Sequence, residues 1–309
     1  AYPGRIEVAA GGDFDSRTPA DSAQIAAVAP QTEEIDNLRV SALLGHRNVR
    51  WVERRGLESL RGLQDVKLGA EVGLALGRSV PSIENDDDFF GTLTLYTGVE
   101  AGDGLFAFRG RTDVRRDLLA PANTEEWEDF YGDAEFLAYW HLGQLPRSTL
   151  FFRAAGLGAW NTRTPFQITL GGDRALRGYD NERFPGGRRA VFSFEHRFYA
   201  GWPFPQLFDF GTTLFADVGR IWPGDVPFGT DSGWRSSAGF GLRGAFPAGS
   251  RTSYRVDFAW PIEKHVGLRD FRVRFSIGES AGLSAAESDF QFLRSRAQTV
   301  GGPLFEFRN

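Results

Sequence analysis

The chain has 309 residues, among them 38 glycines and 28 phenylalanines, and its formal net charge is −5 at pH 7. It contains no cysteine, which excludes disulfides, thiolate metal sites and a cysteine nucleophile. The modest charge gives no reason to expect nucleic acid as a partner, and the sequence has no run of eighteen apolar residues that could form a transmembrane helix.

Alternation of apolar and polar residues predicts about a dozen β-strands, separated by turn-forming residues. In chain order the predicted strands are Arg5–Gly12, Asn37–Arg54, Asp65–Arg78, Phe89–Val99, Leu105–Arg115, Asp129–Leu142, Thr149–Trp160, Arg188–Ala200, Phe210–Arg220, Ser236–Ala245, Tyr254–Trp260 and Phe271–Gly278. Most are close to the length of about ten residues that a tilted membrane strand needs, whereas strands of soluble proteins cluster near five or six.

The two faces of these strands differ in polarity. In Arg188–Ala200, the phenylalanines at 192 and 194 share one face, while Glu195 and Arg197 share the other. A membrane barrel shows this alternation because one face meets lipid and the other lines a wet lumen. A soluble β-sandwich would alternate in the same way, but strand length favours the membrane. The residues predicted to face lipid include Phe192, Phe194, Val256, Phe258, Val273 and Phe275.

Tryptophans near the ends of predicted strands also favour a membrane barrel, because aromatic side chains form belts at both membrane interfaces. They are Trp51, Trp140, Trp160, Trp202, Trp222 and Trp260. Connection lengths point the same way. Gly143–Arg147 and Ala200–Gln206 are short, whereas Asp13–Asp36, Arg115–Trp127 and Asn161–Gly187 are long. Short turns at one end and long loops at the other are typical of bacterial outer-membrane barrels.

The predicted fold class is therefore all-β, with an antiparallel transmembrane β-barrel over residues 1–280 and a polar C-terminal tail over residues 281–309. Because the chain begins at Ala1 and has no methionine, we expect a mature form or a piece of a longer protein. The first strands of the barrel could therefore be missing.

The long connection contains the stretch Leu170–Gly187, which reads LGGDRALRGYDNERFPGG. Its five glycines and Pro185 prevent it from forming one regular strand. Long ordered loops are usually functional, and the mixture of charged and aromatic side chains suggests a segment that docks into something. We predict that it folds back inside the barrel, with Arg177 as its anchor.

The four residues Leu176, Arg177, Gly178 and Tyr179 spell LRGY. This resembles the [V/I/L]RG[F/Y] motif of the BamA-like outer-membrane β-barrel superfamily, which includes the two-partner-secretion transporters and the bacterial surface antigen proteins. GGD precedes the motif, a glycine-rich turn follows it, and five predicted strands come after it, as in that superfamily. The resemblance covers about residues 37–280, and its second half is the more specific.

The resemblance also implies partners for the loop arginine, which reaches an acidic group on the following strands in the superfamily. The matching positions are Glu195 in FEHRF and Asp217 in FADVG. Both lie on the face that alternation assigns to the lumen. A guanidinium offers five donors in a rigid fork, and two carboxylates on neighbouring strands can accept them. An arginine in a solvated loop is the alternative for Arg177 considered alone.

The chain departs from the superfamily in its number of strands. Members resemble sixteen-stranded barrels preceded by periplasmic domains, whereas about twelve strands are predicted here. Either the first strands and those domains are missing from this chain, or the barrel is a shortened one.

The resemblance implies a bacterial outer-membrane location and a barrel that inserts or translocates client proteins. Its expected partners are outer-membrane lipid, client or partner proteins, and periplasmic domains outside this chain. A barrel that only anchors a partner or an attached domain is the alternative. An enzyme built on a soluble β-sandwich is the least favoured hypothesis.

No pattern of catalytic or metal-binding residues supports an enzyme, so neither a cofactor nor a metal is expected. The four histidines, at positions 46, 141, 196 and 265, are isolated from one another. The stretch Gly239–Gly244 matches GxGxxG but lies in a predicted strand with no helix after it, so the dinucleotide interpretation fails.

Overall fold

A computed structural model describes fourteen β-strands and no helix within the described residues. Those residues are 5–12, 38–80, 87–119, 127–143, 148–163, 166–172, 175–200, 206–263, 267 and 270–279. The predicted tail, residues 281–309, lies outside them. None of the described residues forms a helix long and apolar enough to cross a membrane.

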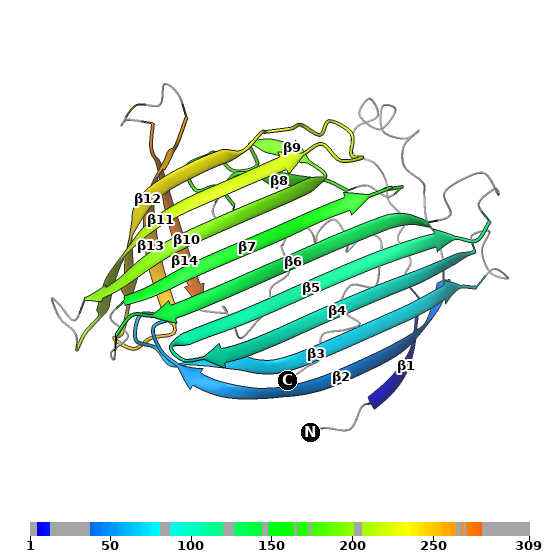
Figure 1. Cartoon of the computed structure of the whole chain (residues 1–309), viewed down its shortest axis with the longest axis horizontal. Helices are drawn as coiled ribbons and strands as arrows, with labels where there is room; N and C mark the ends of the chain where they lie inside the picture. The colour runs from blue at the N-terminus through cyan, green and yellow to red at the C-terminus, as the bar shows by residue number, and fades with distance from the viewer. Residues whose placement is uncertain are drawn as a thin grey trace.

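Twelve of the strands form one antiparallel sheet (Figure 1). They are β1 (Arg5–Gly12), β2 (Leu38–Arg54), β3 (Gln64–Ser79), β4 (Asp88–Ala101), β5 (Gly104–Asp117), β6 (Trp127–His141), β7 (Ser148–Trp160), β10 (Arg188–Ala200), β11 (Asp209–Trp222), β12 (Arg235–Ala245), β13 (Thr252–Pro261) and β14 (Arg272–Glu279). Each strand pairs with its neighbours in chain order, and β7 pairs directly with β10. The all-β prediction and its dozen strands are confirmed, with each boundary within two residues of the prediction.

The sheet is rolled around an interior (Figure 1). It begins at β1 and ends at β14, and within the described part of the chain no strand pairs with the outer edge of either. The rolled, antiparallel sheet has the form of a β-barrel wall with an open seam between its first and last strands.

The outer and inner faces of the sheet are chemically distinct, as alternation predicts. On β10, 46% of Phe194 is exposed, whereas the adjacent Glu195 is 3% exposed. Of the other residues predicted to face lipid, Phe192, Val273 and Phe275 are exposed, and Val256 and Phe258 are half-buried. Phe258 stacks on Phe240 of β12, with ring centroids 5.1 Å apart. Aromatic and aliphatic side chains therefore cover the outside of the sheet.

Tryptophans lie on the outer face near strand ends, as an interfacial belt requires. Trp51, Trp140 and Trp160 are exposed, and Trp222 and Trp260 are half-buried. Trp202 lies outside the described residues. The described tryptophans thus mark both ends of the strands.

Replacing Phe194 by arginine should cost about 2–4 kcal/mol of unfolding free energy, because its outward position near mid-strand would place a charge in hydrocarbon. Urea unfolding of the barrel reconstituted in lipid vesicles measures this cost. Phe194→Leu is the matched control and should lose much less. Parent-like stability of Phe194→Arg would contradict the assignment of this face to lipid.

Candidate functional site

The connection between β7 and β10 folds into the lumen as a hairpin. Its strands β8 (Ile168–Leu170) and β9 (Phe184–Gly186) pair with each other. Ile168 and Leu170 are fully buried in a cluster with inward side chains of the barrel wall, among them Tyr131 and Ile221. The LRGY motif lies between these two short strands, and its Leu176 is fully buried in the same cluster. Apolar burial thus carries the motif inside the sheet.

Arg177 bridges two inward carboxylates of the wall. Its Nε and Nη2 donate to Oδ2 and Oδ1 of Asp217 at 2.8 and 2.6 Å, which is a bidentate pair. Its Nη1 donates to Oε1 of Glu195 at 2.6 Å. The backbone N–H of Arg177 also donates to Asp217 at 3.3 Å. The structure thus brings together the three charged residues that the sequence singles out.

Two further residues complete the surroundings of the guanidinium, and the sequence interpretation missed both. The ring of Phe215 lies beneath it, with the Cζ of Arg177 3.6 Å from the ring centroid, which is favourable for a cation–π interaction. Oδ2 of Asp257 on β13 lies 3.5 Å from Nη1 of Arg177. Asp257 lies between Val256 and Phe258, which alternation assigns to lipid. Its inward parity was therefore the available signal, although the motif gave no reason to select it.

The charge of Arg177 is retained in this buried position. Burial by itself disfavours the charged form, but Coulombic attraction to Glu195 and Asp217 outweighs it and raises the pKa of Arg177. The two carboxylates therefore favour the cationic form of Arg177 in this buried site.

Gly178 allows the motif to touch the wall. A Cβ built at this position would lie 2.7 Å from the backbone nitrogen of Pro261 and 2.7 Å from the Cβ of Ser237. Real Cβ atoms do not approach backbone so closely, and only glycine lacks that atom. The motif therefore needs glycine next to its arginine in order to dock.

Tyr179 fastens the other side of the motif. Its side chain is fully buried, and its hydroxyl donates to Oε1 of Glu263 at 2.9 Å and to the carbonyl of Ser236 at 3.3 Å. Burial, together with this acidic neighbour, raises the pKa of Tyr179 to about 12. The hydroxyl thus remains a donor well into the alkaline range.

The last strand of the sheet also holds the loop, which the sequence interpretation missed. Arg274 of β14 donates through Nε to the carbonyl of Arg177 at 2.8 Å, through Nη2 to the carbonyl of Tyr179, and through Nη1 to Oδ1 of Asn181 at 2.6 Å. Arg272 donates to Asp180 at 2.7 Å. The motif therefore ties β11, β10 and β14 to one another through the lumen.

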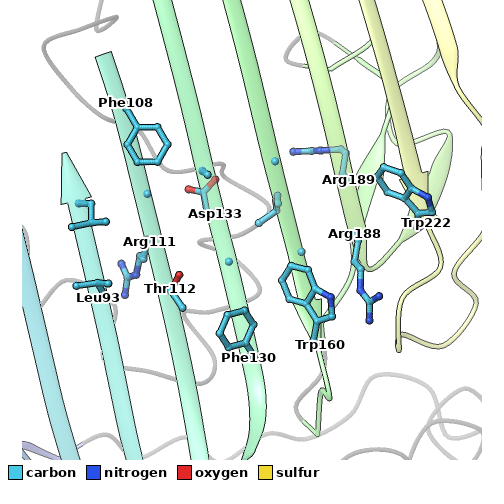
Figure 2. A pocket seen from close by; sticks show the side chains of 17 residues that line it. Leu93, Phe108, Arg111, Thr112, Phe130, Asp133, Trp160, Arg188, Arg189 and Trp222 are labelled. Carbon is cyan, nitrogen blue, oxygen red and sulfur yellow. The ribbon is translucent and has the colours of Figure 1, made fainter. Parts of the chain in front are cut away.

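A separate hollow of about 480 Å³ lies on the outer side of the wall, away from the motif. Figure 2 shows Phe130, Trp160 and Trp222 around one end of it, with Arg188 nearby. It is lined mainly by apolar atoms, and glycines of β5, β6 and β7 are among its lining residues. Such a surface suits contact with lipid chains, and we therefore do not take this hollow as the functional site. The candidate site is the buried motif.

The chemistry of the motif site is electrostatic. Its carboxylates are engaged by arginines, and the described part of the chain holds no group of three metal-binding side chains. The arrangement can hold a loop inside the barrel or release it, and release would expose two wall carboxylates.

Comparison with protein families supports the resemblance carried by LRGY. The model of the Omp85 superfamily domain matches residues 128–281. That stretch runs from β6 to the end of β14 and includes the motif, Glu195 and Asp217. The predicted resemblance to a BamA-like outer-membrane barrel is thereby confirmed. No curated protein matches the chain.

Replacing Gly178 by alanine should prevent the loop from docking, because the added Cβ would collide with the backbone at Pro261. We expect faster tryptic cleavage within residues 161–187, while circular dichroism shows unchanged strand content. The matched control is Gly156→Ala, since a Cβ at that position meets nothing within 4 Å. Equal cleavage of the two variants would show that the close approach at Gly178 does not hold the loop.

Proposed function

We propose that this chain, whose residues 128–281 form an Omp85 superfamily domain, is the barrel of an outer-membrane protein that inserts or translocates client proteins. The proposed location is the bacterial outer membrane. Its partners are lipid, client proteins and, in the complete protein, periplasmic domains. The work is conformational, and we propose that the chain is not an enzyme and uses no cofactor.

The observation that carries this proposal is the buried contact of Arg177 with Asp217 and Glu195. A barrel that served only as a wall would gain little from it, because a buried ion pair contributes weakly to stability compared with apolar packing. The same contact becomes useful when a loop must be held in one position and released into another. A loop that moves within the lumen suits a machine that handles other chains.

The seam of the sheet supports the same function. The outer edges of β1 and β14 lack a strand partner within the described residues, and exposed N–H and C=O groups can pair with an incoming strand. Because Arg272 and Arg274 bind β14 to the motif loop, a movement of the loop would reach this edge. The loop is thus placed to influence how the seam accepts a client strand.

The anchor hypothesis is the second candidate, and the filled lumen favours it. Arg177, Glu195 and Asp217 are all buried inside the sheet, which suits a permanently shut barrel. An anchor would need the loop only as a fixed support. The two hypotheses therefore differ in their expected result when the loop is released: client insertion should fall if the barrel transports clients and should not change if the barrel is an anchor.

The proposal predicts that Arg177→Ala will loosen the loop and impair insertion of an unfolded outer-membrane β-barrel into proteoliposomes. Removing one partner of a desolvated pair typically costs about 3–5 kcal/mol, and a wet lumen should reduce that. Arg183→Ala, an exposed arginine in the same loop, is the matched control and should behave like the parent. An Arg177→Ala barrel that folds, loses its loop contacts and inserts clients at the parental rate would favour the anchor.

A mutant cycle separates the specific contact of Arg177 with Glu195 and Asp217 from a general loss of charge. The double variant Glu195→Gln, Asp217→Asn should mimic Arg177→Ala in loop cleavage and client insertion. Adding Arg177→Ala to that pair should change little more, because residues that act together are not additive. Additive losses across the cycle would mean that the three side chains do not act as a unit.

A further inference from the structure

The short connection between β2 and β3 is buried, although it lies at the end of the sheet opposite the motif loop. Leu57 is 2% exposed, Leu60 is 1% exposed, and Ser59 is fully buried. A solvent-facing turn would leave such side chains in water. Residues 55–63, which we call the β2–β3 turn, therefore fold inward.

The β2–β3 turn contacts the far side of the barrel wall. Its backbone carbonyl at Gly56 accepts hydrogen bonds from Thr149 of β7 and Tyr199 of β10, at 2.8 and 3.0 Å. Leu60 packs with Tyr199 and with Ala245 of β12. Figure 1 places the turn beside the β12–β13 connection, where Gly62 approaches the carbonyl of Ser250. Since β2 and β12 are far apart in the sheet, these contacts cross the lumen.

We propose that the β2–β3 turn is a second lumen insert that closes the mouth opposite the motif loop, and that the two inserts are coupled through one buried ion cluster. Glu58 is the residue that positions the turn in this cluster. The inference depends on the barrel assignment and is independent of which client the barrel handles.

The cluster links both inserts through the wall. Arg197 of β10 donates through Nε to Oε2 of Glu195 at 2.8 Å and through Nη1 to Oε1 of Glu58 at 3.1 Å. Glu195 in turn accepts from Arg177 of the motif loop. The path from loop to turn is therefore Arg177, Glu195, Arg197 and Glu58, without an interruption.

The charges of this cluster balance only when both inserts are present or both are absent. The wall contributes three arginines and three carboxylates: Arg197, Arg243, Arg255, Glu195, Asp217 and Asp257. To this cluster the motif loop adds one positive charge through Arg177, and the turn adds one negative charge through Glu58. Arg61 of the turn pairs separately with Asp209, outside the cluster. Removing one insert alone leaves one uncompensated charge within this poorly solvated cluster, which is costly. Each insert therefore favours the docked state of the other, as reciprocal coupling requires.

Arg243 shows how much the wall relies on the turn. It is 4% exposed, and its Nη2 lies 3.5 Å from Oε2 of Glu58. Its Nε and Nη1 have no hydrogen-bond partner among the described residues. If the turn withdrew, Arg243 would face the lumen without that carboxylate and would draw in water.

Glu58 is suited to this role because it stays ionised. Burial alone would raise its pKa, but Arg197 and Arg243 outweigh burial and lower the pKa of Glu58. Tyr139 of β6 also donates its hydroxyl to this carboxylate. The turn thus presents a fixed negative charge to the two wall arginines.

The first experiment measures conductance of the purified chain in planar lipid bilayers. Glu58→Gln keeps the size of the side chain and removes its charge, so we expect a several-fold rise in the time spent in conducting states. The same variant should show faster tryptic cleavage of residues 161–187 at the other end of the barrel. A purely local role for the turn would leave that cleavage unchanged.

Asp65→Asn is the matched control, because Asp65 pairs with Arg251 outside the cluster and both side chains are well exposed. It should leave conductance and loop cleavage at parental levels. A Glu58→Gln protein that folds, conducts and is cleaved like Asp65→Asn would overturn the proposal.

Charge balance makes a further test possible. Arg177→Gln and Glu58→Gln each unbalance the cluster, with opposite signs, whereas the double variant restores neutrality. We expect the double variant to conduct less than the sum of the single effects predicts. Strict additivity would overturn the coupling, even if the turn alone closes the mouth.

A reversible crosslink gives a test that does not depend on whether the charge variants fold. Because the chain has no cysteine, Leu60→Cys with Ala245→Cys introduces the sole thiol pair, at side chains that pack together. A thiol crosslink should hold the mouth shut and suppress conductance, and cleavage of the crosslink should restore it. Equal conductance in both states would show that the turn does not close the mouth, whatever the outcome of the client-insertion assay.

Discussion

Arg177 and the two carboxylates that hold it, Asp217 and Glu195, are the interaction on which the interior of this barrel depends. Each of the three charges would be destabilising if it were buried by itself, because a buried charge without a partner is far more costly than a buried pair. The ion pairs among them hold a loop of more than twenty residues inside the lumen. The cost of ordering that loop is offset further by the apolar burial of Ile168, Leu170 and Leu176.

The strands were predictable from the sequence because alternation has a physical cause that acts at every position. A residue on a two-sided wall meets either lipid or the lumen, so the alternation of residue types in each strand shows which side chains face which side. The contact of Arg177 with Glu195 and Asp217 was also within reach. The family resemblance supplied the arginine and its two acidic partners, and parity agreed by placing both carboxylates on the inward face.

Contacts across the lumen were beyond reach, because they depend on which strands face each other in the rolled sheet. In residues 55–63 the sequence RGLESLRGL looked like an ordinary connection. Its signal was the pair of leucines at 57 and 60, which a solvated turn would not need. Likewise, β3 reads as one continuous alternation, yet Val66 and Leu68 are buried while Val72 and Leu76 are exposed. The change of face occurs next to Gly69, whose φ of +110° is open mainly to glycine.

The choice of ion pairs in the lumen is itself informative. Apolar residues of similar volume would close a barrel at least as stably as paired charges, so stability is a poor reason for placing the eight charged groups of the cluster there. Charges differ from apolar contacts in one respect: they must be removed in matched pairs if the interior is to stay neutral. A loop that brings Arg177 and a turn that brings Glu58 therefore cannot leave independently without penalty. Whether the motif loop is docked at one end of the barrel thus affects whether the β2–β3 turn is docked at the other, and the coupling passes through side chains of the wall between them. An interior held in this way favours two states, both inserts docked or both withdrawn, over any state between them.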